Sequence, residues 1–375
     1  MIKVLVVDDS ALMRKLFATV LTVQAGFDVR FARNGLEALD ELERFGPDVV
    51  TLDVQMPYMD GLECLDRIMV QRPCPVVMVS SLTDEGADAT LQALALGAVD
   101  FVPKPDGAVS LRMDAFAPTL VGKIRAATHA KVRASLRLKE RVQHRIGGAA
   151  TVARVPATAR IAAERAPRLP RGDVPRSATG DGVVLVGTST GGPPALEALL
   201  TGLPARFPWP IVIAQHMPEG FTGPLARRLD GVCEIRVVEA SRPVALEAGC
   251  AYIGRGGLDI VVARRAGALT AMSAAPHADY LWHPSTDRLV RSAMSQLPAS
   301  QLVGILMTGM GNDGANAMAQ LHAQGGRTIA ESEETAVVWG MPGELVKAGG
   351  ADWVVPLSEI AGRLLQIMPT HATHP

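Results

Sequence analysis

Aromatic residues make up only 4% of this 375-residue sequence, and its charges nearly cancel. Hydrolases that act on lipids or other large apolar esters need an apolar, aromatic-rich acyl pocket, so the shortage of aromatics disfavours that class. Lysine and arginine number 37 against 38 aspartate and glutamate residues, which gives a net charge of −1. Nucleic-acid-binding proteins carry a basic excess or a basic stripe, so we expect no nucleic-acid partner.

Cysteine is scarce, and long apolar runs are missing. The four cysteines show no C-x-x-C spacing, which argues against a zinc site or a disulfide framework and favours buried thiols in a reducing compartment. The longest apolar runs, such as Val76–Val79 and Leu302–Met307, fall far short of the roughly 20 residues that span a bilayer. Met1 leads directly into a strand-like segment, so no leader is expected. The sequence therefore predicts a cytoplasmic protein without direct membrane insertion.

Residues 1–130 alternate short β-branched runs with amphipathic stretches. The runs predicted as strands are Ile2–Val7, Val29–Ala32, Val49–Leu52, Val76–Val79 and Val99–Val102. The stretches predicted as helices are Ser10–Gln24, Gly35–Arg44, Gly61–Gln71, Gly86–Leu96 and Asp114–Ala130. Five βα units in succession predict an α/β domain with a doubly wound parallel sheet and helices on both faces.

Residues 131–180 are rich in alanine, arginine and proline and are predicted to form a linker. A second alternating region, residues 181–368, is predicted to be a catalytic domain, followed by a tail at residues 369–375. Its predicted strands are Val183–Val186, Ile211–Ala214, Ile235–Val238, Tyr252–Ile253, Ile260–Ala263, Val303–Met307 and Trp353–Val355. Its predicted helices are Pro193–Leu200, Gly220–Leu229, Thr286–Ser295, Gly314–Gln324 and Leu357–Ile367. Several middle strands have no helix between them, so we expect an antiparallel excursion on a mainly parallel sheet.

Charged and hydroxyl side chains follow the predicted strands of the first domain. Asp8 and Asp9 come after the first strand, and Asp53 ends the third. The carboxyl ends of parallel strands meet at one edge of a sheet, so three carboxylates there predict a Mg²⁺ site. One carboxylate could then accept a phosphoryl group, while Lys104 and Ser80, at the ends of the fifth and fourth strands, could bind its oxygens.

The alternative for Asp8, Asp9 and the serine after them is a helix cap, which leaves Asp53 and Lys104 unexplained. The segments VLVVDDSALMR, LDVQMPYMDG, VMVSS and DFVPKP resemble the receiver domain of two-component response regulators. The resemblance implies a flavodoxin-like fold with Asp53 as the phosphoacceptor and with Mg²⁺ held by Asp8, Asp9 and Asp53. It also implies that Ser80 is the switch hydroxyl, that Lys104 is the phosphate partner and that a histidine kinase is the phosphodonor.

A serine motif opens the second domain. Gly187-Thr188-Ser189-Thr190-Gly191 fits G-x-S-x-G between a predicted strand and a predicted helix, where a sharp turn exposes the hydroxyl. The same turn could instead bind an anion at the helix N-terminus. His216 ends the next strand and Asp313 follows a later one, so a base and an orienting acid could meet Ser189 at one sheet edge. A structural histidine and a helix-capping aspartate are the alternatives.

The order Ser189, His216, Asp313 differs from that of α/β-hydrolases. The segments VGTSTGGPPAL, VIAQHMP, TGMGNDGA and VVWGMP resemble the catalytic domain of the protein-glutamate methylesterases of bacterial chemotaxis, the CheB family. The resemblance implies a second, Rossmann-like doubly wound domain and these three residues as a catalytic triad. It further implies demethylation of glutamyl methyl esters, and deamidation of glutamines, on the cytoplasmic helices of methyl-accepting chemoreceptors. The implied kinase is CheA-like, and no cofactor is expected for the hydrolase.

The second site also needs hydrogen-bond donors for the oxygen of the tetrahedral intermediate. We expect the backbone N–H groups of His216 and Met310 to form the oxyanion hole. The sequence departs from the family's usual residues at Gln55, Arg255, His283 and Glu331, where the family usually has glutamate, the A-P-G run, arginine and glutamine. The changes at His283 and Arg255 bear on substrate recognition.

The receiver is expected to pack on the catalytic domain and obstruct Ser189 until Asp53 is phosphorylated. The alternative functions are a non-catalytic, receptor-binding signalling adaptor and a methylesterase that serves a signalling array other than chemotaxis.

Overall fold

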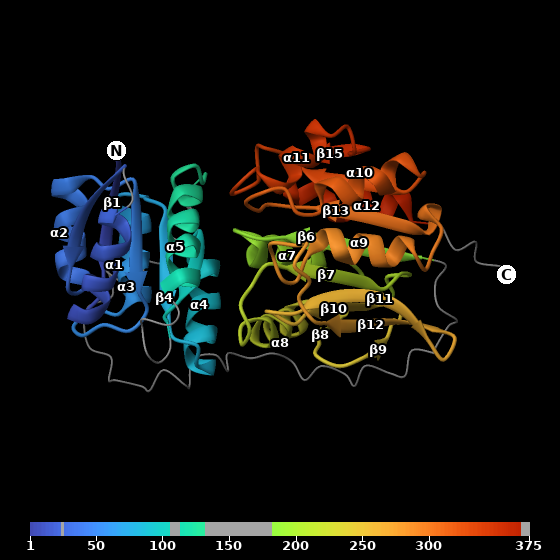
Figure 1. Ribbon diagram of the computed structural model, residues 1–375, viewed down its shortest axis with the longest axis horizontal. Coiled ribbons are helices and arrows are strands. Elements are labelled where there is room, and N and C mark those ends of the chain that lie inside the picture. The colour runs from blue at the N-terminus through green and yellow to red at the C-terminus, as the bar shows by residue number, and fades with distance from the viewer. Residues whose placement is uncertain (24–25, 106–112, 132–181, 369–375) are drawn as a thin grey trace, which may run out of the picture.

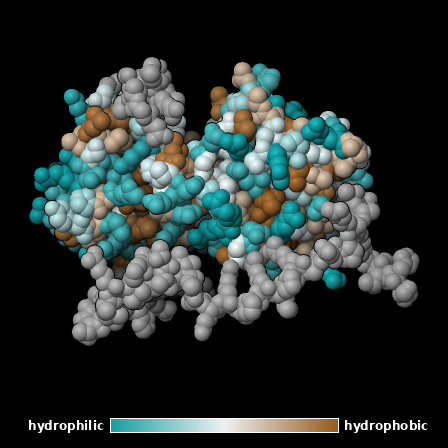
Figure 2. Space-filling view, turned by 90° about the horizontal axis from the view of Figure 1, so that it is seen from below, coloured by the Kyte–Doolittle hydropathy of each residue, from teal (hydrophilic) through white to brown (hydrophobic). Residues whose placement is uncertain are grey.

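The computed structural model describes residues 1–23, 26–105, 113–131 and 182–368. The predicted linker, apart from Lys131, and the predicted tail lie outside the described residues. Two α/β units make up the described part and stand side by side in Figure 1. Among these residues, no helix combines the length and the apolar character that crossing a membrane requires. On the face drawn in Figure 2, hydrophilic side chains dominate and hydrophobic ones form small patches.

The N-terminal unit is a five-stranded parallel sheet in the order β2-β1-β3-β4-β5. Its strands are β1 (Ile2–Val7), β2 (Phe27–Ala32), β3 (Val49–Asp53), β4 (Val76–Ser80) and β5 (Asp100–Pro103). Its helices are α1 (Ala11–Val23), α2 (Gly35–Phe45), α3 (Gly61–Gln71), α4 (Asp84–Leu96) and α5 (Met113–Thr128). Helices α2, α3 and α4 cover one face and α1 and α5 the other, which buries the valine- and leucine-rich central strands on both faces. The predicted doubly wound architecture is confirmed.

The C-terminal unit has a seven-stranded sheet in the order β15-β14-β13-β6-β7-β10-β8, in which every pair is parallel. These strands are β6 (Val183–Thr188), β7 (Ile211–Gln215), β8 (Arg236–Ala240), β10 (Cys250–Gly254), β13 (Leu302–Leu306), β14 (Arg327–Glu331) and β15 (Trp353–Val355). The antiparallel strands form a separate sheet from β9 (Val244–Ala245), β11 (Asp259–Arg265) and β12 (Ala268–Ala274). The expected excursion is therefore a small second sheet.

Helices cover both faces of the large sheet. One face carries α7 (Gly192–Thr201), α8 (Thr222–Val232) and α12 (Leu357–Ile367). The other carries α9 (Thr286–Met294), α10 (Ala315–Ala323) and α11 (Met341–Lys347). The strand order reverses between β6 and β13, and in open parallel sheets ligands bind at the carboxyl ends of the strands beside such a point.

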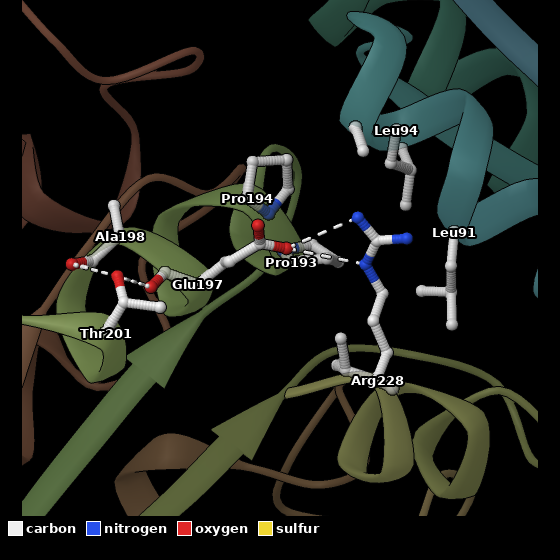
Figure 3. Close-up of a pocket in the computed structure, with 10 residues that line it drawn as sticks. Leu91, Leu94, Pro193, Pro194, Glu197, Ala198, Thr201 and Arg228 are labelled. Carbon is white, nitrogen blue, oxygen red and sulfur yellow. Dashed lines mark hydrogen bonds and ion pairs between the residues drawn. The ribbon is translucent and has the colours of Figure 1, made fainter. Parts of the chain in front are cut away.

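The two units pack against each other through α4 on one side and α7 and α8 on the other. The ring of Phe101, in β5, lies 4.4 Å from that of Phe221, which precedes α8. A cavity of about 260 Å³ lies between these helices, and Figure 3 shows the side chains that line it. Leucines of α4, prolines of α7 and an ion pair between α7 and α8 line it, namely Leu91, Leu94, Pro193, Pro194, Glu197 and Arg228. Buried residues of both units thus form one continuous cluster.

Candidate active site

The first candidate site is the acidic cluster of the N-terminal sheet. Asp8 and Asp9 follow β1 and Asp53 ends β3, and their carboxylates offer oxygens that all lie within 4.8 Å of one another. The Nζ of Lys104 lies 2.6 Å from Oδ2 of Asp53 and 3.5 Å from Oδ2 of Asp8. A surface cavity of about 770 Å³ opens onto Asp9, Asp53 and Lys104. The structure therefore brings together four of the residues that the sequence placed at strand ends.

Burial shapes the electrostatics of this cluster. Burial raises the pKa of Asp53 to about 6, although the hydrogen bond and charge of Lys104 oppose it. Burial also raises the pKa of Asp8, and Oδ2 of Asp8 is buried without a hydrogen bond among the described residues. For Lys104, burial lowers the pKa, but the hydrogen bond and charge of Asp53 outweigh it and leave the pKa raised. Crowded carboxylate oxygens with an unfilled acceptor are a set that fits a divalent cation.

Ser80 ends β4, beside this cluster, but its hydroxyl bonds to the backbone of α4 and not to the carboxylates. The Oγ donates to the carbonyl oxygen of Gly86, at 3.0 Å, near the start of α4. A Cβ at Gly86 would lie 3.1 Å from that Oγ, so glycine permits the approach. The carbonyl oxygen of Ser80 accepts from the N–H of Lys104, at 2.7 Å. The sequence placed Ser80 at the right strand end, whereas its side-chain rotamer depends on packing against α4.

The second candidate site surrounds Ser189, in the turn between β6 and α7. The N–H of Ser189 and the hydroxyl of Thr188 both donate to the carbonyl oxygen of Thr308, each at 3.0 Å. The hydroxyl of Thr308 donates to the carbonyl oxygen of Thr190, at 2.8 Å. A Cβ at Gly309 would lie 2.8 Å from Cβ of Ser189, so only glycine allows this close contact. The turn after β13 therefore holds the serine turn on both sides.

His216 and Asp313 meet beside this turn. The Nε2 of His216 lies 2.8 Å from Oδ2 of Asp313, and the side chains are only 7% and 4% exposed. The Nδ1 of His216 is buried and has no hydrogen-bond partner among the described residues. With its proton on Nε2 and donated to the carboxylate, the imidazole keeps a lone pair on Nδ1. Nδ1 is therefore the atom that can take a proton.

Asp313 is held by donors from the start of α9. It accepts hydrogen bonds from the hydroxyl of Ser285 at 2.9 Å and from the N–H groups of Thr286 at 2.6 Å and Asp287 at 3.1 Å. Burial alone would raise the pKa of Asp313, but the hydrogen bond and charge of His216 and these N–H groups outweigh it and lower the pKa. An ionised carboxylate in this place can fix the imidazole and stabilise its protonated form.

The site contains further polar and aromatic residues that sequence reasoning missed. The side-chain amide of Gln215 donates to the carbonyl oxygens of Ser189 and His216, each at 3.1 Å, and so ties the two loops together. The indole of Trp282 stacks on the ring of His216. Gln215 could have been suspected from its place next to His216 at a strand end, whereas nothing in the sequence signals Trp282.

The backbone N–H of His216, expected in the oxyanion hole, already has a hydrogen-bond acceptor. The backbone N–H of His216 donates to the carbonyl oxygen of Thr188, at 3.0 Å, which extends the ladder between β6 and β7. This N–H is therefore not free to bind an oxyanion, and we drop it from the expected oxyanion hole. The N–H of Met310 stays a prediction.

The four residues that depart from the usual pattern of the family that the sequence resembles each have a defined contact. The Nδ1 of His283 lies 2.9 Å from Oδ1 of the buried Asp259, and Arg255 pairs with Glu219. Glu331 is fully buried and accepts from the N–H of Thr308, at 2.8 Å. The N–H of Gln55 donates to Oδ1 of Asp53, at 3.3 Å.

Known protein families match both units of the chain. The CheB methylesterase family matches residues 184–364, and the response regulator receiver domain matches residues 4–114. A protein-glutamate methylesterase/protein-glutamine glutaminase of Rhodopseudomonas palustris is 54% identical over 98% of both chains. Another, of Rhodospirillum rubrum, is 52% identical and covers 97% of this chain and 95% of its own length. The crystal structure of the Thermotoga maritima CheB methylesterase catalytic domain is 35% identical with a TM-score of 0.48, and covers 50% of this chain and 98% of its own.

Proposed function

This chain belongs to the CheB methylesterase family, and on that premise we propose that it is a protein-glutamate methylesterase and glutaminase whose catalytic triad is Ser189, His216 and Asp313. The observation that carries the assignment is the hydrogen bond of 2.8 Å between His216 and Asp313, beside the serine turn, with Nδ1 of His216 buried and without a partner among the described residues. These groups follow three different strands of one parallel sheet, next to the reversal of strand order.

The proposed reaction is acyl transfer through Ser189. Its Oγ attacks the γ-carbonyl carbon of a glutamyl methyl ester while its proton passes to Nδ1 of His216, and Asp313 stabilises the imidazolium. The tetrahedral intermediate collapses, the C–O bond to the methoxy group breaks, and His216 returns the proton so that methanol leaves. Water, deprotonated by His216, then attacks the acyl-enzyme and releases glutamate and Ser189. With a glutamine substrate, ammonia leaves in place of methanol.

The N-terminal unit is the proposed regulator. We assign residues 1–130 to the receiver, 131–180 to a linker, 181–368 to the catalytic domain and 369–375 to a tail. Asp53 would accept a phosphoryl group, and Lys104 would pair with its oxygens. Asp8, Asp9 and Asp53 would hold Mg²⁺, which when bound offsets the repulsion of the carboxylates and of the transferred group.

The proposed partners follow from the two halves. A histidine kinase of the CheA type would supply the phosphoryl group, since a receiver takes it from such a donor. Methyl-accepting chemoreceptor helices, on their cytoplasmic side, would be the substrate. The names of the relatives, which specify protein glutamate and glutamine, support a protein substrate.

Control would act through the packing of the two units. The receiver residue Asp100 accepts a hydrogen bond from Thr190, the neighbour of Ser189, so the docked receiver reaches the serine turn itself. Phosphorylation adds a charge of about −1.5 to −2 at Asp53. Repulsion and the rearrangement of Ser80 would then weaken the interface. A bias of about 1–3 kcal/mol suffices to change activity several-fold or more.

Substitution of the nucleophile tests the proposed reaction. In Ser189→Ala, we expect methanol release from methylated receptor fragments to fall by roughly 10⁶-fold, the loss seen when other triads lose their serine. Release is measured with a small-molecule phosphodonor such as acetyl phosphate, and Ser295→Ala, an exposed serine, is the control. Phosphorylation of Asp53 should be unchanged in both variants. Methanol release at the normal rate from Ser189→Ala would refute the assignment.

A further inference from the structure

The indole of Trp282 covers one face of the catalytic imidazole. The rings of Trp282 and His216 are parallel to within 3°, and their centroids are 5.5 Å apart, which is an offset stack. Gly311, with φ of +87°, makes room for the indole, because a Cβ there would lie 2.8 Å from its Cη2 atom. The side chain of His216 is only 7% exposed, and Trp282, which stacks on it, is partly exposed.

Trp282 lies near the end of the loop between β12 and α9, and two buried carboxylates hold this part of the loop in place. The hydroxyl of Ser285 donates to Asp313 at 2.9 Å, and its N–H donates to Asp259 at 2.8 Å. His283 adds a contact of 2.9 Å from Nδ1 to Asp259. The loop that carries the indole is thus anchored, through Ser285, to the same carboxylate that contacts His216.

We propose that Trp282 is a positioning residue of this triad, which holds the imidazole of His216 with Nδ1 available to the nucleophile and favours its protonated form. The proposal rests on the proposed triad. Offset stacking resists rotation of the ring about its Cβ–Cγ bond. A positive charge within about 6 Å of an indole face is also attracted to it. Because His216 gains that charge only when it takes the serine proton, the attraction acts on the transition state more than on the ground state.

The effect of Trp282 on the orientation and protonation of His216 can be separated from the effect of Asp313. Among the described residues, Asp313 is the charged group in contact with the His216 ring, and it belongs to the turn before α10. The turn after β6 and the end of β7 contribute uncharged groups, the backbone of Thr188 and the amide of Gln215. Trp282 carries no charge at any working pH. A change confined to its ring therefore alters orientation and the balance of protonation without removing a charge.

The test uses the rate at which a fluorophosphonate probe labels Ser189 in the full chain with acetyl phosphate present. Trp282→Leu keeps an apolar side chain but removes the ring, and we expect labelling to be about three- to tenfold slower. The acidic limb of its pH profile should move to lower pH, because the protonated imidazole has lost an attractive face. Trp282→Phe keeps a ring and should restore both the rate and the limb.

A matched control removes another tryptophan. Trp353→Leu, in the edge strand β15, removes a partly buried indole without touching His216 and should label at the normal rate. Normal labelling of Trp282→Leu, or a Phe variant as slow as the Leu variant with an unmoved acidic limb, would overturn the proposal. Absence of labelling at Ser189 in the unmodified chain would instead refute the triad, so the two failures are distinguishable.

A second measurement covers the case in which Trp282→Leu does not fold. The difference in emission between the unmodified chain and Trp282→Phe isolates the fluorescence of Trp282. A protonated imidazole stacked on an indole quenches it, so this difference should fall with decreasing pH over the same range as the acidic limb of the labelling rate. Emission that is independent of pH over that range would contradict the proposed contact.

Discussion

Two opposing influences act on the carboxyl group of Asp53. The Nζ of Lys104, at 2.6 Å, favours its charged form, whereas burial disfavours it, and burial prevails because the pKa is raised to about 6. The folded chain therefore binds a proton at Asp53 more tightly than the unfolded chain, whose pKa is near 3.8. Its contribution to stability is present at low pH and is lost as the pH rises from about 4 through about 6. A cation bound to the folded chain would offset this loss of stability at neutral pH.

The same carboxyl group predicts how Mg²⁺ binding depends on pH. Protons and Mg²⁺ compete for Asp53, so we expect the affinity for Mg²⁺ to fall as the pH decreases through about 6. Binding should release a proton near and below that pH, and the release should approach zero at higher pH, where Asp53 is already ionised. Calorimetric titrations of the full chain between pH 5 and 8 measure both quantities. Asp53→Asn, which cannot take up the proton, is the control and should lose the step near pH 6. An affinity that is constant between pH 5 and 7.5 would contradict the prediction.

At the scale of elements, the end of β14 supports the turn after β13. The buried carboxylate of Glu331 accepts from the N–H of Thr308, at 2.8 Å, and from the hydroxyl of Thr335, at 3.0 Å. Thr308 in turn holds the serine turn. A glutamine can accept from Thr308 through its oxygen and donate to Thr335 through its amide, so both contacts survive without a charge.

Two substitutions of Glu331 follow from that arrangement. Glu331→Gln should leave the free energy of unfolding nearly unchanged, whereas Glu331→Leu leaves a buried N–H and a hydroxyl without this acceptor and should lower it by about 1–3 kcal/mol. Urea unfolding of the full chain, followed by far-ultraviolet circular dichroism, measures the difference. Glu333→Gln, on the exposed turn that follows, is the control and should have little effect. Equal loss of stability in the Gln and Leu variants would show that the charge itself is required.

Strong local patterns made most elements predictable, and the missed ones lack such patterns. The strands β1, β3, β6, β7 and β13 are rich in valine, leucine and isoleucine, and all were predicted close to their observed bounds. The strand β12 reads ALTAMSA, and its hairpin turn uses Ala266 and Gly267 at positive φ in place of an Asn-Gly pair. The strand β14 and the short helix α11 gain their stability from the sheet and from the packed turn at Gly309.

The residues of the candidate sites also fall into two groups, those predictable from strand ends and those set by tertiary packing. The placement of Ser189, His216 and Asp313 at one edge of the sheet was predictable because parallel strands bring their carboxyl ends together there. Trp282 comes from a loop far along the chain, and its stacking depends on the space left by Gly311. The proposal that Nδ1 of His216 is the base also depends on the orientation of the ring, which places Nε2 against Asp313. Such contacts are set by tertiary packing and leave no periodic trace in the sequence.

At the scale of the whole molecule, a short chain of polar contacts joins the receiver to the serine turn. Asp100, at the start of β5, is buried and accepts from Nζ of Lys123, at 2.7 Å, and from the hydroxyl of Thr190. The carbonyl oxygen of Thr190 accepts from Thr308, whose own carbonyl oxygen binds the N–H of Ser189. Lys131 adds a second link, because its Nζ donates to the carbonyl oxygen of Glu333, at 2.6 Å. The receiver is thus bonded to Thr190, the residue next to the proposed nucleophile.

Removing the hydroxyl of Thr190 should release the unphosphorylated enzyme. Thr190→Val keeps the shape of the side chain but leaves Asp100 with one donor fewer, and a hydrogen bond to a charged group contributes about 1.5–3 kcal/mol. We therefore expect the demethylation rate without phosphodonor to rise by about tenfold, while the rate with acetyl phosphate stays the same.

Thr190→Ser retains the hydroxyl and is the control. Asp100→Asn should act in the same direction, and the double variant should be no faster than either single one, because both changes break one contact. Equal basal rates in the Val and Ser variants would mean that the contact does not restrain the enzyme, whereas a change of the phosphorylated rate would place its effect in the serine turn and not in the interface.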